Sequence, residues 1–175
     1  MRKLMRNALA FFRGILLHIG YPKKIGLKNR VFSGVSIRLY SGSKYKIGNN
    51  IKFDNNAVVA VQRTGELQIG NNVGIGPNNY IVCHKKISIG DGTILGPSVF
   101  IYDHDHEYLP ETGVEAHKYK YGEVIIGKNC WIGANTVILK GTVIGNNCLV
   151  GAGCVIKGKY PDGVKIVQKR STSVF

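Results

Sequence analysis

Aliphatic residues recur every six positions along much of this chain. The longest run passes without slippage through Ile126, Ile132, Ile138, Ile144, Val150 and Ile156, and shorter runs begin at Ile69 and Ile89. Glycine often follows the aliphatic residue, so the repeat has the form aliphatic-Gly-x-x-small-x. A period of six fits neither a 3.6-residue helix nor a long alternating strand. It fits a short strand and a turn repeated many times, which predicts a parallel β-solenoid.

The alternation within each hexad predicts which side chains fill the solenoid. Cys130 and Ile132 lie on one side of a strand and Trp131 on the other. The small fifth residue and the next aliphatic residue therefore face inward, and glycine relieves the backbone at each corner. Three hexads make an 18-residue triangular coil, and we expect such coils over residues 45–158.

The repeat divides the chain into a coil region and two ends. Residues 1–44 are expected to hold a helical or capping segment and degenerate first coils, and residues 159–175 a C-terminal tail. The hexads break over residues 102–123, which we expect to project from the solenoid as a loop, the usual place for function.

The N-terminal 20 residues have two compatible interpretations. They carry Arg2, Lys3, Arg6 and Arg13 without an acidic residue, and Leu4, Leu9, Phe12, Leu16 and Ile19 recur at helical spacing. One interpretation is a helix on a membrane surface. The other is a helix that caps the open end of the solenoid.

Composition limits the partners and the compartment. The formal net charge of +14 predicts an anionic partner. No cleavable signal peptide and no membrane span is evident, which favours a cytoplasmic protein, with peripheral membrane contact through residues 1–20. Cys130 and Cys148 stand one predicted coil apart, within disulfide reach, but buried free thiols are the simpler reading of all four cysteines.

The hexads IGKNCWIGANTVILKGTVIGNNCLVGAGCVIK resemble those of the left-handed β-helix acyltransferases, over roughly residues 45–165. Within that family the chain is similar to the maltose, galactoside and polysaccharide O-acetyltransferases. The resemblance implies an all-β, left-handed parallel β-helix with a short N-terminal helical segment and a protruding active-site loop. It also implies a homotrimer that binds acetyl-CoA between neighbouring subunits, and no metal.

Transfer of an acetyl group to a hydroxyl needs a base for the hydroxyl and hydrogen-bond donors for the oxyanion. The resemblance places the base at His106, with His104 as the alternative, and Asp103, Asp105 and Glu107 alternate with these rings. It also brings the outward-facing Trp131 close to the catalytic histidine. His84 and His117 suggest a zinc site, but the spacing of His104 and His106 does not match the carbonic anhydrases that share this fold.

The remaining site residues also come from the resemblance. The thioester carbonyl would meet the amides of Gly133 or Ala134, and the pantetheine arm those of Gly151 and Ala152. The nucleotide phosphates of acetyl-CoA would meet basic side chains, namely Lys157, Lys159, Lys169 and Arg170. The acceptor would meet Asn78 or Asn79, Tyr102 and Asp105, since the sugar-binding asparagine of the small-sugar enzymes falls near Gly76.

These features together predict an acetyl-CoA-dependent O-acetyltransferase acting on a sugar hydroxyl, in capsular or surface polysaccharide biosynthesis. Direct transfer in a ternary complex needs no covalent acyl-enzyme. An acetyltransferase that inactivates an antibiotic would show the same hexads and histidines. A basic solenoid scaffold or nucleic-acid-binding module is the non-enzymatic alternative, although no aromatic-basic recognition motif occurs and nucleic acid is not the expected partner.

Overall fold

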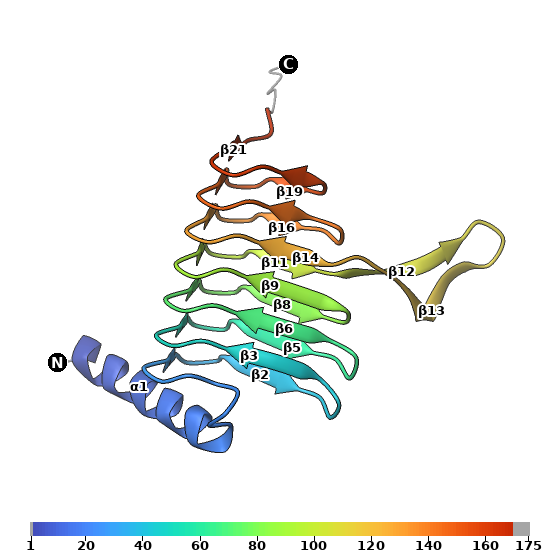
Figure 1. Ribbon diagram of the computed structural model, residues 1–175. Helices are drawn as coiled ribbons and strands as arrows, with labels where there is room; N and C mark the ends of the chain where they lie inside the picture. The colour runs from blue at the N-terminus through green and yellow to red at the C-terminus, as the bar shows by residue number, and fades with distance from the viewer. Residues whose placement is uncertain (1, 170–175) are drawn as a thin grey trace, which may run out of the picture.

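The computed structural model describes residues 2–169. Helix α1 (Arg2–Gly20) lies across one end of a three-sided solenoid whose strands stack in parallel from coil to coil (Figure 1). The parallel solenoid with one N-terminal helix is thereby confirmed, while its left hand stays a prediction from the resemblance.

Each side of the solenoid is one parallel sheet, named here after its first strand. The β2 face consists of β2 (Ser36–Leu39), β5 (Val58–Val61), β8 (Tyr80–Cys83), β11 (Phe100–Tyr102), β16 (Val137–Ile138) and β19 (Val155–Ile156). The β3 face consists of β3 (Lys44–Ile47), β6 (Glu66–Ile69), β9 (Lys86–Ile89), β14 (Val124–Ile126), β17 (Val143–Ile144) and β20 (Lys159–Tyr160). The β1 face consists of β1 (Arg30–Val31), β4 (Lys52–Phe53), β7 (Gly74–Ile75), β10 (Ile94–Leu95), β15 (Trp131–Ile132), β18 (Leu149–Val150) and β21 (Lys165–Ile166).

The coils shorten along the chain, which corrects the predicted uniform period of 18. Stacked corner residues are 22 apart at Asn49 and Asn71, 20 apart at Asn71 and Asp91, 18 apart in the next complete coil and 16 apart at Asn146 and Asp162. The early coils are longer because strands such as β5 and β6 have four residues, whereas β16 and β17 have two.

The first coil lies before residue 45, where degenerate coils were expected, since Ile25 pairs with Ile47 in parallel. At the other end the solenoid extends beyond the predicted range. Residues 159–166, expected in the tail, form β20 and β21 and pair with the coil below. Tyr160 and Pro161 stand where the aliphatic-Gly pair is expected in this last coil, so the repeat does not reveal it.

The inward positions are those that the hexads predict. Ile126, Ile132 and Ile138 are at most 1% exposed, and the small residues Cys130 and Thr136 fill the space between them. All four cysteines are buried free thiols. Burial raises the pKa of the Cys83 thiol to about 12, so that the thiol holds its proton at neutral pH.

The hexad glycines serve a different purpose from the predicted one. A side chain at Gly127 or Gly133 would lie 2.5 Å from the backbone of the coil above, so these glycines allow the coils to stack closely. Most non-glycine residues that adopt the left-handed conformation at the corners are asparagines, such as Asn129 (φ 54°) and Asn147 (φ 57°). Asparagine tolerates this region because its short side chain bonds locally, here to the stacked asparagine of the next coil.

Helix α1 caps the solenoid, as one of its two interpretations predicts. Ala10 is buried against the first coil, and a side chain at Gly14 would overlap the backbone of Asn29. The His18 Nδ1 atom lies 2.6 Å from the Ile25 carbonyl oxygen, and the Arg6 guanidinium lies over the Phe32 ring. Across the described residues, no helix combines the length and hydropathy needed to cross a bilayer.

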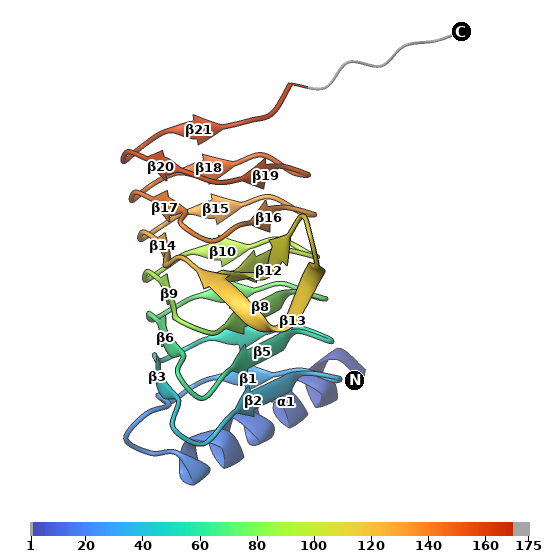
Figure 2. The same cartoon turned by 90° about the vertical axis from the view of Figure 1, so that its right-hand side faces the viewer.

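The predicted projecting loop is a β-hairpin. Strands β12 (His104–Leu109) and β13 (Gly113–Tyr121) pair antiparallel, with a register shift between His106 and Glu107. The hairpin leaves the solenoid at the corner between the β2 and β3 faces, called the hairpin corner below, and extends well beyond the coils (Figures 1 and 2).

Candidate functional site

A buried carboxylate anchors the base of the hairpin. Asp103 follows β11, is fully buried, and accepts hydrogen bonds from the backbone N–H groups of His84, Lys85 and Lys86 at 2.7–3.1 Å. Burial alone would raise the Asp103 pKa, but the bonds from His104 and from these amides outweigh it, and the pKa lies below its ordinary value. Asp103 is therefore an anion at neutral pH.

Two imidazoles stack above this carboxylate. The His84 and His104 rings lie 3.7 Å apart at 24°, and His104 Nδ1 lies 3.2 Å from Asp103 Oδ1. Burial and the neighbouring His104 lower the pKa of His84, against the opposing pull of Asp103. The sequence suggested His84 only as a possible zinc ligand, and it did not predict this stack because a uniform 18-residue coil does not bring positions 84 and 104 together. Within residues 2–169, no three potential ligands form a metal site.

His106 differs from His104 in exposure and in partners. It lies two residues further along β12, is exposed, and contacts the Tyr119 ring across the hairpin at 4.6 Å between centroids. Among residues 2–169, none forms a hydrogen bond with its ring, whereas the His104 side chain is 13% exposed and tied to Asp103. Of the two predicted bases, His106 is the one free to receive a substrate.

An ion pair fixes the hairpin to the coil above it. Lys140 Nζ lies 3.3 Å from Asp105 Oδ2, and the Lys140 side chain is largely buried. Asp105, which the resemblance assigns to the acceptor, is thus engaged with this lysine. The sequence did not predict a role for Lys140, which stands in a hexad where glycine does not directly follow the aliphatic residue.

An aromatic row leads along the outer side of the β2 face to these histidines. Tyr80 stacks on Phe100 at 5.7 Å, Phe100 stacks on Tyr102 at 6.4 Å, and the edge of Tyr102 meets His104 at 6.1 Å. Tyr102, an expected acceptor residue, therefore lies beside the histidines. The row offers an apolar surface with polar groups at one end.

Trp131 does not meet the histidines within one chain. It points outward from the β1 face and is 58% exposed, next to the exposed Ile94 of the coil below. The hairpin leaves the corner opposite this face, since that corner joins the β2 and β3 faces. In Figure 1 the hairpin extends to the right, while β21 of the β1 face lies at the left. Only a neighbouring subunit could bring the two together.

Two of the four amides expected to meet acetyl-CoA are already occupied. The N–H groups of Gly133 and Gly151 donate to the carbonyls of Val150 and Ile166 at 2.8 Å, as part of the stacking between coils. The next N–H groups, those of Ala134 and Ala152, donate to no acceptor in residues 2–169. These two alanines stand one coil apart at the corner between the β1 and β2 faces, which we call the alanine corner.

The expected phosphate-binding residues do not converge within one chain. Lys157 and Lys159 are exposed at the hairpin corner of the upper coils, away from the alanine corner. Lys169 follows Gln168, whose side-chain amide bonds both backbone groups of Val155 on the β2 face. Arg170 lies outside the described residues.

Of the two asparagines expected to bind the acceptor, one is excluded by its burial. Asn79 is 0% exposed, and its Oδ1 atom accepts the Val99 N–H at 2.7 Å inside the solenoid. Asn78 is exposed, but it occupies a left-handed corner position and accepts a hydrogen bond from Asn56. The alternation that faces Val73 inward also faces Asn79 inward, and the sequence pattern could have shown this.

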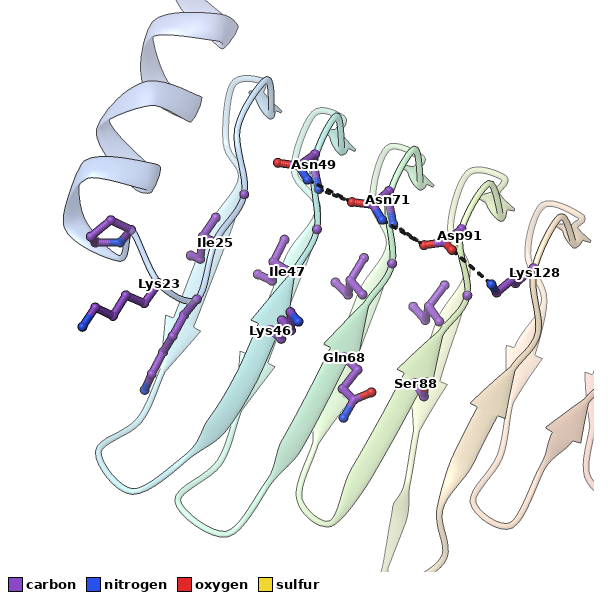
Figure 3. Close-up of a pocket in the computed structure, with 18 residues that line it drawn as sticks. Lys23, Ile25, Lys46, Ile47, Asn49, Gln68, Asn71, Ser88, Asp91 and Lys128 are labelled. Atoms are coloured by element: carbon purple, nitrogen blue, oxygen red, sulfur yellow. Dashed lines mark hydrogen bonds and ion pairs between the residues drawn. The ribbon is translucent and has the colours of Figure 1, made fainter.

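A second concave surface follows the corner between the β3 and β1 faces, and the sequence did not predict it. Asn49, Asn71, Asp91 and Lys128 form a ladder of hydrogen bonds and one ion pair along it (Figure 3). Lys23 and Lys46 lie toward the end of the groove nearest helix α1 (Figure 3), and Lys24 also lines the groove. The groove is basic at that end, and none of the predicted site residues lines it.

Comparison with known proteins agrees with the repeat and the fold. A model of the bacterial transferase hexapeptide (six repeats) matches residues 123–158. Nodulation protein L of Rhizobium meliloti is 42% identical over 107 residues, covering 56% of each chain. The putative lipopolysaccharide biosynthesis O-acetyl transferase WbbJ of Escherichia coli is 30% identical over 110 residues, 58% of this chain and 56% of that protein. The chain thus spans about half the length of these relatives.

The fold agrees with that of a solved N-acyltransferase. A mutant of AntD from Bacillus cereus, in complex with dTDP-4-amino-4,6-dideoxyglucose and coenzyme A, superposes with a TM-score of 0.72. The match covers 89% of this chain and 84% of that one at 22% identity, which speaks for the fold alone. The chain thus carries the bacterial transferase hexapeptide repeat over residues 123–158, and it is similar to these relatives over about half of their length.

Proposed function

We propose that the protein transfers an acetyl group from acetyl-CoA to a hydroxyl of a sugar or glycan precursor. The observation that carries this proposal is the set of groups at the hairpin base. The exposed imidazole of His106 contacts Tyr119, two residues along the strand from His104. His104 is held by Asp103 and lies at the end of the aromatic row. A free imidazole next to an apolar platform suits the activation of a hydroxyl on a ring-shaped acceptor.

The reaction needs one proton transfer and one displacement. His106 accepts the hydroxyl proton as the acceptor oxygen attacks the thioester carbonyl. The negative oxygen that forms there meets a free backbone N–H, for which Ala134 is the candidate. When the tetrahedral intermediate collapses, the carbon–sulfur bond breaks and the proton on His106 passes to the thiolate of coenzyme A. The products are the acetyl ester and free coenzyme A, with no acyl-enzyme.

The complete site requires a second subunit in this proposal. The hairpin supplies the base from one subunit, while Trp131 and the alanine corner come from the neighbour. In one chain the hairpin corner lies opposite the β1 face that holds Trp131, and the alanine corner is a different corner of the solenoid. The two free amides would then line the donor site, with the lysines of the upper coils near the phosphates. Acetyl-CoA is a substrate here, bound across the interface of a homotrimer.

The acceptor class rests on the relatives and on the aromatic row. WbbJ is named as an O-acetyl transfer enzyme of lipopolysaccharide biosynthesis, and AntD was solved with a sugar nucleotide. Tyr80, Phe100 and Tyr102 offer the apolar platform on which a sugar ring can stack. An acceptor in surface polysaccharide assembly fits these observations better than an antibiotic.

The test compares His106→Ala with His104→Ala in a thiol-release assay with acetyl-CoA and a panel of sugar acceptors. Because general-base catalysis contributes about 10²–10⁴ in rate, His106→Ala should lose at least a hundredfold in kcat. Its affinity for coenzyme A should change little, since the base meets the acceptor rather than the nucleotide.

His104→Ala should lose less, because that ring is tied to Asp103 and positions the hairpin. If His104→Ala were the inactive variant and His106→Ala retained near-normal turnover, the base would be His104 and the proposed role of His106 would be wrong. Absence of coenzyme A binding by the wild-type protein would reject the acyl-transfer proposal itself.

A further inference from the structure

The outer face of helix α1 is apolar along its whole length. Ala10, Gly14 and Leu17 face the solenoid, whereas the other large apolar residues of the helix face away from it. Exposed side chains with 41–80% of their surface accessible are Leu4, Met5, Leu9, Phe11, Phe12, Ile15, Leu16 and Ile19. A helix on the surface of a globular domain normally turns its polar residues outward. Helix α1 instead turns its large apolar residues outward. Eight neighbouring apolar side chains form a patch of the kind that marks an interaction site.

The positive charge of the protein is concentrated at the same end. The first 53 residues contain 12 of the 24 Lys and Arg residues and none of the 10 acidic ones. The first acidic residue is Asp54, in the second coil. Lys23, Lys24 and Lys46 line the basic end of the groove beside the helix. The rest of the chain is nearly neutral, with 12 basic and 10 acidic residues.

The arrangement in space puts both features on one side. Helix α1 lies across the end of the solenoid, so its outer face points along the solenoid axis, away from the coils (Figure 1). Arg6 lies over Phe32 of the first coil, which places its guanidinium beside the apolar face rather than within it. Such a helix can lie in the plane of a bilayer surface, with basic side chains at the level of the headgroups.

We propose that helix α1 docks the protein on the surface of an anionic lipid bilayer. The apolar side chains of its outer face enter the boundary between headgroups and acyl chains, and the basic first coils meet the lipid phosphates. The occupant is a membrane rather than a protein, because the charge around the patch has one sign over 53 residues and matches an anionic leaflet. The catalytic hairpin then stands above the surface, several coils from it.

The test is co-sedimentation of the full chain with vesicles of phosphatidylcholine alone or with added phosphatidylglycerol. The wild-type protein should bind the anionic vesicles, bind the neutral ones at least tenfold more weakly, and lose affinity as salt is raised to about 1 M, where charge is screened within about 3 Å. The double variant Leu16→Ser, Ile19→Ser should bind anionic vesicles at least tenfold more weakly, which corresponds to about 1.4 kcal/mol.

The control is Val155→Ser, Val167→Ser, at the opposite end of the solenoid. Its side chains are 48% and 66% exposed, against 53% and 66% for Leu16 and Ile19, so both double variants remove similar exposed apolar surface. The control should bind like the wild type, and both variants should keep the wild-type Tm. Failure of the wild-type protein to bind anionic vesicles, or equal losses in both variants, would overturn the proposal. A helix variant that changes the native mass but not vesicle binding would assign the patch to a protein contact instead.

Discussion

Asp103 joins the hairpin to the coil beneath it through a single carboxylate. Its oxygens accept three backbone N–H groups of the preceding coil and lie beside His104, so one buried group fixes both the hairpin base and an imidazole. An ionised carboxylate has only hydrogen-bond acceptors, whereas the side chain of similar size in asparagine also carries N–H donors. The residue therefore positions the candidate site and does not itself reach a substrate.

Asp103→Asn should lower the free energy of unfolding by about 2–4 kcal/mol, because bonds to a charged acceptor contribute about 1.5–3 kcal/mol each and the new amide hydrogens face other donors. Thermal unfolding followed by circular dichroism measures the loss. Asp105→Asn is the matched control: its side chain is 54% exposed and only forms an ion pair with Lys140, so its loss should stay below about 1 kcal/mol.

The pH dependence of the same variant follows from the lowered Asp103 pKa. A carboxyl whose pKa is lower in the folded state stabilises that state above its ordinary pKa of 3.8, and loses this effect as pH falls through the folded value. The difference in Tm between wild type and Asp103→Asn should therefore be constant from about pH 7 to 5 and narrow below about pH 4. A difference that instead grew in acid would contradict the assignment.

At the scale of the strand, inward and outward neighbours should respond oppositely to charge. Ile138 is fully buried in β16, whereas the adjacent Val137 faces outward and is partly exposed. Ile138→Asp should destabilise the solenoid by about 3–5 kcal/mol, because a buried unpaired charge remains without a partner. Val137→Asp should cost about 1 kcal/mol or less. Recovery of a soluble Ile138→Asp protein with wild-type Tm would show that the register is wrong.

The hexads predict the strands and their inward residues because one six-residue rule decides both. The burial of Cys130, Thr136 and Ile138 could be predicted from their positions in the repeat alone. The length of a coil depends on how many residues each of its sides holds. The hexad pattern does not mark which strands have four residues, as β8 does, so it does not predict this length. His84 stacks on His104 because the coil between them has 20 residues. The sequence pattern therefore could not predict this contact.

The residues of the proposed donor site show the same limit. Gly133 and Ala134 were both predicted from resemblance, but only stacking of the coils decides which N–H is consumed. The hexad glycine donates to the coil above it, and the residue that follows does not. The expectation for Asn79 was wrong because it rested on the closeness of Asn79 to Gly76 in the sequence, whereas the alternation turns Asn79 inward.

For the whole molecule, the proposed function predicts a trimer. The native mass by sedimentation equilibrium at micromolar concentration should be three times the chain mass of 19.2 kDa. Trp131, the only tryptophan, should change its fluorescence when coenzyme A is added, since it lies on the proposed shared surface. Trp131→Ala should abolish that change and retain the fold. A purely monomeric protein with an unresponsive Trp131 would reject the shared site.

The position of the hairpin also bears on how such a protein can change its substrate. The pairing that spans the hairpin joins Thr93 and Cys130 across 37 residues, whereas a neighbouring coil spans 20. Loop-closure entropy rises only by about 0.6 kcal/mol for each doubling of length, so the hairpin adds less than that to closing its coil. Its sequence can therefore be lengthened, shortened or exchanged with little effect on folding, as long as Asp103 is kept. Under the proposed function, evolution can alter acceptor choice at this point while the scaffold stays constant.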